Sequence, residues 1–373
     1  MFSLPSIKIG KVFGFDIEIN YTWFIIFLVI LFQFTLLFNA EISSLPISIL
    51  VSLIASLLFF SSLLFHELCH SCVARLNDLP IKKITLFIFG GVAEMTKEPS
   101  TPAVELKMAI AGPLASLLLS GIFYGFFLLA GFFNFGLPVT VPLSYLALIN
   151  LMLAIFNLVP GFPLDGGRIL RAILWFFLKD IKPATKIASL AGQGFAYLLI
   201  FVGFLSVIQG LIGGIWFILI GWFLNWAAQG SYQQVLLQRA LSGVRVSEIM
   251  TGNVLTVAPS LTLDEIVNDY FLKHRFGRFP VAEGDNFLGV ITIHDVKKIP
   301  REKWAFTKVG EIVQHSAKSL TIGPDNDAVH ALMQMAREEL GHLLVVNKEK
   351  KLIGIITRTD IIRLIKVKTE LGM

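Results

Sequence analysis

The sequence has few charged residues, and this scarcity excludes a wholly soluble protein. Asp, Glu, Lys and Arg make up 15% of its 373 residues, hydrophobic residues make up 55%, and the mean hydropathy is +0.74. Soluble domains carry about 25% charged residues. The charge is also uneven, because residues 1–230 hold only 12 of the 31 Lys and Arg and 10 of the 26 Asp and Glu. We therefore expect residues 1–230 to lie in a membrane and the remaining residues to be soluble.

Cysteine is also scarce, and the basic residues form no patch. Cys69 and Cys72 lie in one apolar stretch, so we expect small packing residues of a helix rather than a disulfide framework. The net charge of +5 comes from residues that flank apolar runs, which argues against a nucleic-acid-binding surface. Asp16 and Glu18 precede the first apolar run, so we expect no cleaved signal peptide.

Uncharged stretches predict six membrane spans. The stretches 19–40 and 42–65 each have room for one span of about 20 residues. The longer stretches 108–164 and 187–238 are interrupted by turn residues, and each has room for two spans.

The distribution of basic residues predicts the orientation of these spans. The connections at 39–46, 134–142 and 206–214 contain no Lys or Arg, and all basic residues of the first 230 fall on the opposite side. Because basic residues stay on the cytoplasmic side, we expect a multi-pass protein of the cell membrane with both termini in the cytoplasm.

Three ionisable residues follow one another closely at the end of the second predicted span, in Phe65-His66-Glu67-Leu68-Cys69-His70. Histidines four residues apart share one helix face, about 6 Å apart along its axis, so both can bind one Zn²⁺. The glutamate between them can then act on a water at the metal. Ionisable residues within a span are costly and usually functional. The alternative is a helix end that reaches the interface, where these side chains simply meet water.

A zinc protease site needs a third ligand, and Asp165 is the best candidate. It lies in the segment 157–168, where two prolines and three glycines interrupt the fourth predicted span. Irregular backbone at membrane depth occurs where it lines a cavity or is buried in protein. By the predicted orientation, Asp165 and Glu67 reach similar depths from the inner side. The alternative is that Asp165 only caps the start of a helix.

Together the two motifs resemble those of the site-2 protease family of intramembrane zinc metalloproteases, which pairs an HExxH helix with an NxxPxxPLDGG-type segment. The resemblance covers about residues 1–230. It implies one Zn²⁺ per chain held by His66, His70 and Asp165, with Glu67 as the catalytic acid/base. It also implies that the substrate is a single-span membrane protein, cleaved within the membrane.

Other positions fit the family pattern or depart from it. Gly90-Gly91 and Ala111-Gly112-Pro113 fit. Cys69 stands where Gly or Ala is commoner, and Ser116 where Asn is frequent, but neither is an expected ligand. Asn157 is a further catalytic candidate, since its amide could orient the substrate backbone or stabilise an oxyanion. A hydrogen bond between helices explains Asn157 equally well.

Residues 81–99 read as an apolar β-hairpin that bends at Gly90-Gly91. An extended substrate can add to the unpaired edge of such a hairpin. The alternative is an inert connector that dips into the membrane. Residues 1–20 are expected to form a similar short strand pair.

The tail contains an internal repeat, because the pattern of residues 289–295 returns 65 positions later at 354–360. It resembles a tandem pair of CBS domains, at 244–300 and 308–368, preceded by a linker at 231–243. The resemblance implies an adenine nucleotide between the repeats, bound near its ribose or phosphate by Thr292, Asp295, Thr357 and Asp360. A ligand-free module that forms a homodimer is the alternative.

The expected fold is an α-helical polytopic membrane protein, with six transmembrane helices and a short membrane-associated β-hairpin, followed by a cytoplasmic α/β tandem CBS pair. The expected function is intramembrane zinc proteolysis of membrane-tethered regulatory proteins, modulated by a nucleotide at the CBS pair. The alternative from another class is a CBS-regulated membrane metal-ion transporter. A transport pathway needs polar residues along its depth, whereas the outer halves of the predicted spans are almost purely apolar. An inactive scaffold, a third possibility, would be expected to lack Glu67.

Overall fold

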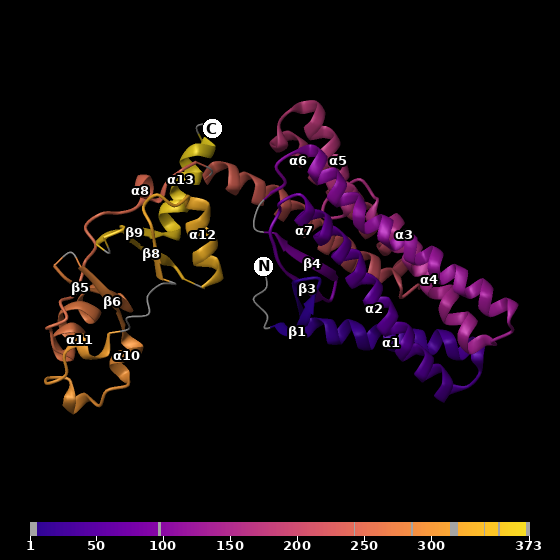
Figure 1. Ribbon diagram of the computed structural model, residues 1–373, viewed down its shortest axis with the longest axis horizontal. Helices are drawn as coiled ribbons and strands as arrows, with labels where there is room; N and C mark the ends of the chain where they lie inside the picture. Colours follow the sequence, from indigo (N-terminus) through magenta and orange to yellow (C-terminus); the bar gives the residue numbers. More distant parts are fainter. Residues whose placement is uncertain are drawn as a thin grey trace. The chain divides into compact units, whose positions relative to one another are not determined.

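The computed structural model describes residues 6–95, 98–241, 243–284, 286–313, 320–338, 340–349 and 351–370. The chain forms two compact units, Met1–Gln233 and Gln234–Met373. The boundary between them lies inside helix α7 (Gly214–Leu241). Figure 1 labels most of the helices and strands of each unit.

Long apolar helices make up most of the first unit (Figure 1). Five of the described helices are long and apolar enough to cross a membrane, namely α1 (Tyr21–Ile42), α2 (Leu45–Leu76), α3 (Pro102–Phe132), α4 (Leu137–Asn157) and α6 (Ile181–Ile208). The first half of α7 is a sixth apolar stretch, and the shorter α5 (Asp165–Leu178) lies between α4 and α6 in sequence. The prediction of a multi-pass membrane protein is confirmed.

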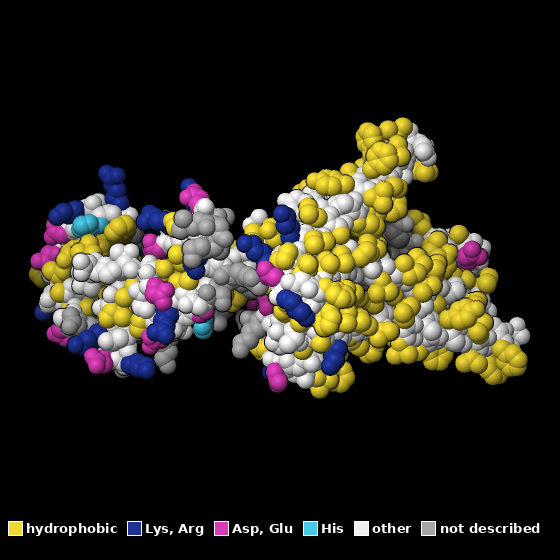
Figure 2. All heavy atoms as spheres, turned by 90° about the horizontal axis from the view of Figure 1, so that it is seen from above, with side chains coloured by type: hydrophobic (Ala, Val, Ile, Leu, Met, Phe, Trp, Pro, Cys, Tyr) yellow, Lys and Arg dark blue, Asp and Glu magenta, His cyan; other side chains and the backbone are white. Residues whose placement is uncertain are grey.

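The surface and the helix ends of this unit suit a bilayer. Figure 2 shows hydrophobic side chains spread widely over the surface of this unit, as expected where the solvent is lipid. Several helices begin at a side chain that caps a free backbone N–H. Asn20 accepts a hydrogen bond from the backbone N–H of Thr22 at the start of α1, and Asp180 accepts one from Lys182 at the start of α6.

A four-stranded sheet joins segments that are distant in sequence. Its strands are β1 (Ser6–Val12), β2 (Phe15–Asn20), β3 (Ile81–Phe87) and β4 (Gly90–Met95), in the order β1-β2-β3-β4. The β1–β2 and β3–β4 hairpins are antiparallel, as the sequence predicts, but β2 also pairs with β3 in parallel. The two hairpins, expected as separate strand pairs, therefore form one sheet.

An apolar core shared with α2 explains why the two hairpins join. Phe15 and Ile17 of β2 and Ile84 of β3 are buried together with Leu68, which lies two residues before His70. Burying these side chains is favourable only if both hairpins lie against the same end of α2. The sheet thereby lies beside the HExxH motif, with β4 at its edge.

The segment between α4 and α5 is fixed by packing against α6 and α7. The backbone N–H of Phe162 donates to the carbonyl of Ala188 at 3.1 Å, and the Phe162 ring is buried with Ala188 and Ala228. Leu164 is buried between Ala196 and Leu224. These contacts therefore fix the position of Asp165, the first residue of α5.

The second unit contains two similar αβ repeats. Each has an antiparallel strand pair followed directly by a helix, and each has its own apolar core. The first repeat contains β5 (Arg278–Glu283), β6 (Asn286–Thr292) and α10 (Ile293–Lys297), and the second contains β8 (His342–Val346), β9 (Leu352–Thr357) and α13 (Arg358–Glu370). The remaining elements are α8 (Val246–Ile249), α9 (Leu263–Glu265), η1 (Ile266–Leu272), η2 (Arg301–Lys303), α11 (Val309–Ile312), β7 (Thr321–Ile322) and α12 (Ala328–Arg337).

Candidate metal centre

Three side chains from α2 and α5 converge on one point. The Nε2 atoms of His66 and His70 each lie 3.1 Å from Oδ2 of Asp165, and 3.2 Å from one another. Within the described residues, this is the one group of His, Cys, Asp or Glu side chains found to be arranged for a metal ion. Ligands bound at about 2.0–2.1 Å to a tetrahedral zinc ion lie roughly 3.3 Å apart, so the triangle has the size that zinc needs.

The Nδ1 atom of each imidazole, on the far side of the ring from the metal centre, has a polar contact of its own. Nδ1 of His70 lies 2.7 Å from the carbonyl oxygen of Met108, which can only accept a hydrogen bond. The proton of a neutral His70 ring is therefore on Nδ1, and Nε2 keeps a free lone pair for a metal. Nδ1 of His66 lies 2.8 Å from Oγ of Ser116. Such partners fix the orientation of metal-binding histidines.

Gly112 allows α3 to lie directly against the two imidazoles. A Cβ atom at this position would overlap Nε2 of both His66 and His70. Any larger residue would therefore collide with both candidate nitrogen ligands. The donor set, its spacing and the absence of a side chain at Gly112 all fit a bound zinc ion.

Glu67 and the edge of the sheet face the same cavity, which has a volume of about 150 Å³. Its lining includes Glu67, His70 and Asp165, together with Arg168 and most of β4. Gly91 of β4 approaches Glu67 so closely that a Cβ atom would lie 2.5 Å from its Cγ. A carboxylate, the candidate metal ligands and an edge strand are thus brought together.

A buried ion pair ties α5 to the start of α3. Nε of Arg171 donates to Oε1 of Glu105 at 2.6 Å, and its Nη2 lies 3.2 Å from Oε2 of Glu98. Glu105 is 0% exposed and Arg171 is 5% exposed. This pair lies two helical turns from Asp165 and helps to hold α5 in place.

The structure places the other predicted residues outside this cavity. Nδ2 of Asn157 donates to the carbonyl of Leu153 in its own helix, and Asn157 does not line the cavity that contains Glu67. In the second unit, Oγ1 of Thr292 donates to Asp295 at 2.6 Å and Oγ1 of Thr357 donates to Asp360 at 2.7 Å. Each Asp also accepts from the backbone N–H of its Thr, so both pairs cap the helix that follows.

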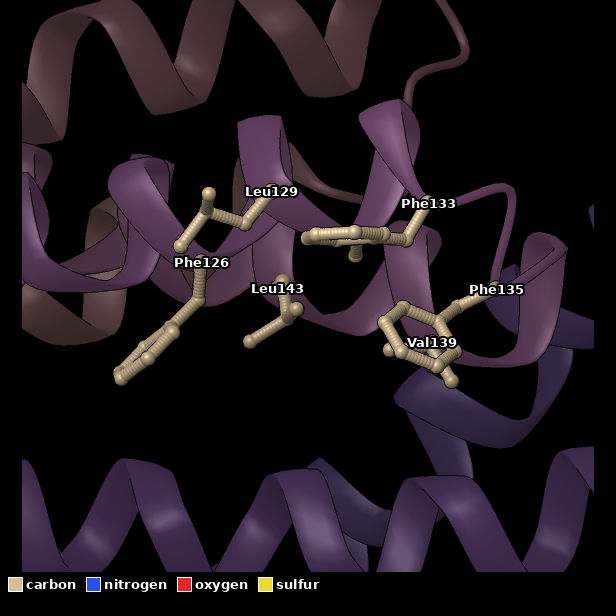
Figure 3. Close-up of a pocket in the computed structure, with 7 residues that line it drawn as sticks. Phe126, Leu129, Phe133, Phe135, Val139 and Leu143 are labelled. Carbon is tan, nitrogen blue, oxygen red and sulfur yellow. The ribbon is translucent and has the colours of Figure 1, made fainter.

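A second cavity, of about 440 Å³, lies near the turn between α3 and α4. Figure 3 shows the phenylalanine, leucine and valine side chains that line it. Its lining residues carry no polar side chain, so it offers no group for catalysis or metal binding. Its hydrocarbon surface suits contact with lipid tails.

Comparison with known proteins identifies the family. The model of peptidase family M50 matches residues 54–139 and 134–202, which contain both halves of the metal centre. A zinc metalloprotease of Methanocaldococcus jannaschii is 34% identical over 373 residues, covering 98% of this chain and 98% of that protein. The chain belongs to peptidase family M50. This is the site-2 protease family that the two motifs resemble, so the chain is an intramembrane zinc metalloprotease.

Two further similarities cover the M50 region. A relative from Synechocystis sp. is 33% identical over 366 residues, covering 96% of this chain and 95% of that protein. The solved structure of a site-2 protease from Methanocaldococcus jannaschii is 36% identical, covering 61% of this chain and 95% of that chain, with a TM-score of 0.45.

The tail of this M50 protein contains two CBS domains. The CBS domain model matches residues 246–302 and 309–367. The solved CBS domain of a bacterial CNNM/CorC family Mg²⁺ transporter in complex with ATP is 22% identical, covering 36% of this chain and 97% of that chain, with a TM-score of 0.31. The prediction of a protease with a tandem CBS tail is confirmed.

The sequence did not single out three residues that form or support the site. Ser116 was noted only as a departure from the family pattern, yet it contacts His66. Arg168 and Arg171 follow Asp165 by one and nearly two helical turns, which is the signal that could have found them. Their different surroundings depend on tertiary packing, which spacing does not reveal.

Proposed function

We propose that His66, His70 and Asp165 hold one zinc ion per chain and that Glu67 is the catalytic acid/base. The convergence of two Nε2 atoms and one carboxylate oxygen within 3.2 Å, beside a cavity that Glu67 lines, carries this proposal. When bound, zinc would supply a Lewis acid that polarises the scissile carbonyl and makes water more acidic.

The residues of the chain then move one proton. Glu67 takes a proton from water as the water oxygen forms a bond to the carbonyl carbon, and the carbonyl electron pair moves onto oxygen. When this pair returns, the C–N bond breaks, and Glu67 gives its proton to the leaving amine. One water is consumed, and a carboxyl and an amino end are formed. The contacts from Ser116 and Met108 keep both imidazoles oriented throughout.

Metal content and cleavage together test these roles. Purified protein should contain one zinc per chain, and His66→Ala, His70→Ala and Asp165→Ala should each lose it, because three ligands leave no redundancy. Glu67→Gln should keep zinc but no longer cleave single-span model peptides, since an amide cannot take up the proton. A chelator should abolish cleavage by the wild type. Normal zinc content in Asp165→Ala would remove Asp165 from the ligand set.

The substrate that fits this site is a single-span membrane protein presented as an extended strand along β4. The pair Phe87 and Gly90 closes a two-residue turn, so hydrogen-bonded and non-hydrogen-bonded pairs alternate from there. Gly91 and Ala93 fall in non-hydrogen-bonded pairs, and their N–H and C=O groups point away from β3. Both residues line the cavity that contains Glu67, which supports the hairpin as a docking edge rather than an inert connector.

We also propose that both termini lie in the cytoplasm, as the basic residues predict. The sheet that borders the metal centre carries ion pairs suited to a water interface, with Lys8 2.7 Å from Asp16 and Lys83 2.8 Å from Glu18. The connection between α1 and α2 has no basic residue. A thiol introduced by Ser43→Cys in a background that lacks both native cysteines should react with an impermeant reagent from outside the cell only. Labelling from the cytoplasmic side only would show that the protein has the opposite orientation.

For the tail we propose that an adenine nucleotide binds between the CBS repeats. Arg278 lies opposite Thr292 in the strand register, and His342 lies opposite Thr357. Burial and the neighbouring positive charge of Arg278 lower the pKa of His342, which supports a close approach of the two strand ends. A permanent cation beside Thr292 and near His342 suits a phosphate. A ligand-free module that forms a homodimer is the competing function, and absence of nucleotide binding would favour it.

A further inference from the structure

The two arginines of α5 have opposite surroundings, although they lie only three positions apart. The guanidinium of Arg171 is buried and paired with Glu105 and Glu98. The guanidinium of Arg168 is half-buried and lines the cavity of the metal centre. Among the described residues it makes no hydrogen bond or ion pair. Arg168 is thus a cation with protein on one side and the active-site cavity on the other.

The position of Arg168 follows from helix geometry. Residues three apart on a helix share a face, so Arg168 and Asp165 face the same cavity. Glu67 also lines this cavity, and Arg168 is the one permanently charged cation among the lining residues. The charge of Arg168 interacts across space with the carboxylates of Glu67 and Glu105. A guanidinium offers five donors and no acceptor, and leaving those donors half-buried without a hydrogen-bond acceptor costs free energy. A ligand that carries negative charge in this cavity would remove that cost.

We propose that Arg168 is a substrate-contacting residue that donates hydrogen bonds to the scissile carbonyl oxygen as negative charge develops on it. The inference rests on the proposed function, in which that oxygen gains an electron pair inside this cavity. Donors fixed in advance near a developing oxyanion stabilise the transition state more than the bound substrate. The alternative is an arginine that only extends its side chain to water at the membrane surface.

Steady-state kinetics with a cleaved single-span peptide distinguish these roles. Arg168→Gln should lower kcat about 10²–10³-fold, the loss typical of one oxyanion donor. KM should change by less than about threefold, because the contact forms mainly in the transition state. Arg168→Lys should recover part of kcat, because it restores the charge without the planar fork. Zinc content should stay at one per chain in both variants.

Lys179→Gln is the matched control for loss of positive charge next to α5. Lys179 follows the last residue of α5 and lies over the ring of Phe176, outside the cavity. It should keep the wild-type kcat and KM. A rise in KM with unchanged kcat in Arg168→Gln, or equal effects of both substitutions, would overturn the assignment.

Arginine-specific labelling tests the same inference without measuring turnover. In the zinc-loaded protein, p-hydroxyphenylglyoxal should modify Arg168 much faster than the ion-paired Arg171, as read by peptide mass spectrometry. A peptide hydroxamate that occupies the cavity should protect Arg168. Slow modification would mean that the Arg168 guanidinium is already paired, and fast modification that the hydroxamate leaves unchanged would indicate an interfacial arginine. Either result would overturn the inference. If the wild type cleaves no peptide, or Glu67→Gln still cleaves, the proposed function itself fails, and the labelling result remains separate.

Discussion

Residues that contact Nδ1 of the candidate histidine ligands should influence the affinity for zinc. Ser116 is fully buried in α3, and its hydroxyl lies 2.8 Å from Nδ1 of His66. Ser116→Ala should weaken zinc binding about 10–100-fold, as loss of a partner behind a ligand does in other metal sites. Competition with a chelator of known affinity would measure this.

Ser120→Ala is the matched control for this change. Ser120 lies one helical turn further along α3 and donates to the carbonyl of Ala147, away from the metal centre. It loses one hydroxyl from the same helix and should keep the wild-type zinc affinity. Equal weakening by both substitutions would mean that Ser116 acts on helix packing rather than on His66.

The buried pair of Arg171 and Glu105 gives a prediction about stability. Arg171→Leu should destabilise the protein by about 3–5 kcal/mol, because it leaves the Glu105 carboxylate buried without its partner. The double variant with Glu105→Leu should recover most of this loss, because no buried charge remains. Glu98→Gln is the control, since Glu98 is 30% exposed and its contribution should stay below about 1 kcal/mol. Unfolding in detergent would measure all three, and a double variant as unstable as Arg171→Leu would contradict the account.

For single residues, the sequence identifies the candidate metal ligands and catalytic glutamate better than the residues that hold them in place. His66, Glu67 and His70 form a helical motif, and Asp165 lies where the fourth span is interrupted, so local spacing suffices to select them. The contacts of Ser116 with His66 and of Arg171 with Glu105 join residues 50 and 66 positions apart. Such contacts depend on how α2, α3 and α5 pack, and no local pattern reports that.

Strand β4 gives the sharpest test of substrate docking, because the backbone N–H groups of neighbouring residues point in opposite directions. Ala93→Pro removes an N–H that points away from β3, whereas Val92→Pro removes one that bonds to β3 opposite Thr85. Ala93→Pro should therefore keep the sheet, the zinc and the thermal stability but cleave single-span peptides up to about tenfold more slowly, since one hydrogen bond to an added strand is worth up to ~1.5 kcal/mol.

Val92→Pro should instead lower thermal stability, because it breaks the β3–β4 ladder itself. Cleavage rate beside the thermal midpoint separates the two effects. Unchanged cleavage by Ala93→Pro would leave the hairpin as a connector and place the docking edge elsewhere.

The helices and strands also show which features of the fold the sequence pattern can predict. Long uncharged stretches predict the apolar helices correctly, and both expected hairpins form. The bend expected at Gly90-Gly91 lies at Ile88-Phe89 instead, and the two glycines begin β4. The parallel pairing of β2 with β3 was not predictable, because it joins strands on either side of two spans and depends on Phe15, Ile17 and Ile84 sharing a core with α2. The second unit is the opposite case, because Thr-x-x-Asp at residues 292–295 and 357–360 is a local capping-box pattern and both capping bonds are present.

For the whole molecule, helix α7 provides the covalent route by which the tail can influence the protease. The boundary between the two units falls inside α7, so one continuous helix belongs to both. A ligand changes activity only if it binds two arrangements of the protein with different affinity. A coupling free energy of 1–3 kcal/mol would change cleavage about 5–150-fold. We therefore expect ATP or AMP to bind the full-length protein below millimolar concentration and to change the cleavage rate within that range.

Two threonines allow this prediction to be separated from helix stability. Thr292→Ala removes a helix cap as well as a candidate ligand contact, so a loss of about 1 kcal/mol from capping alone must be controlled. Thr262 caps α9 in the same way, with Glu265 in place of Asp295, and carries no predicted nucleotide contact. Calorimetry should show weaker nucleotide binding by Thr292→Ala but not by Thr262→Ala, with zinc content unchanged in both. If neither nucleotide binds, or if binding leaves the cleavage rate flat, the CBS pair serves assembly and control of the protease lies within the membrane domain.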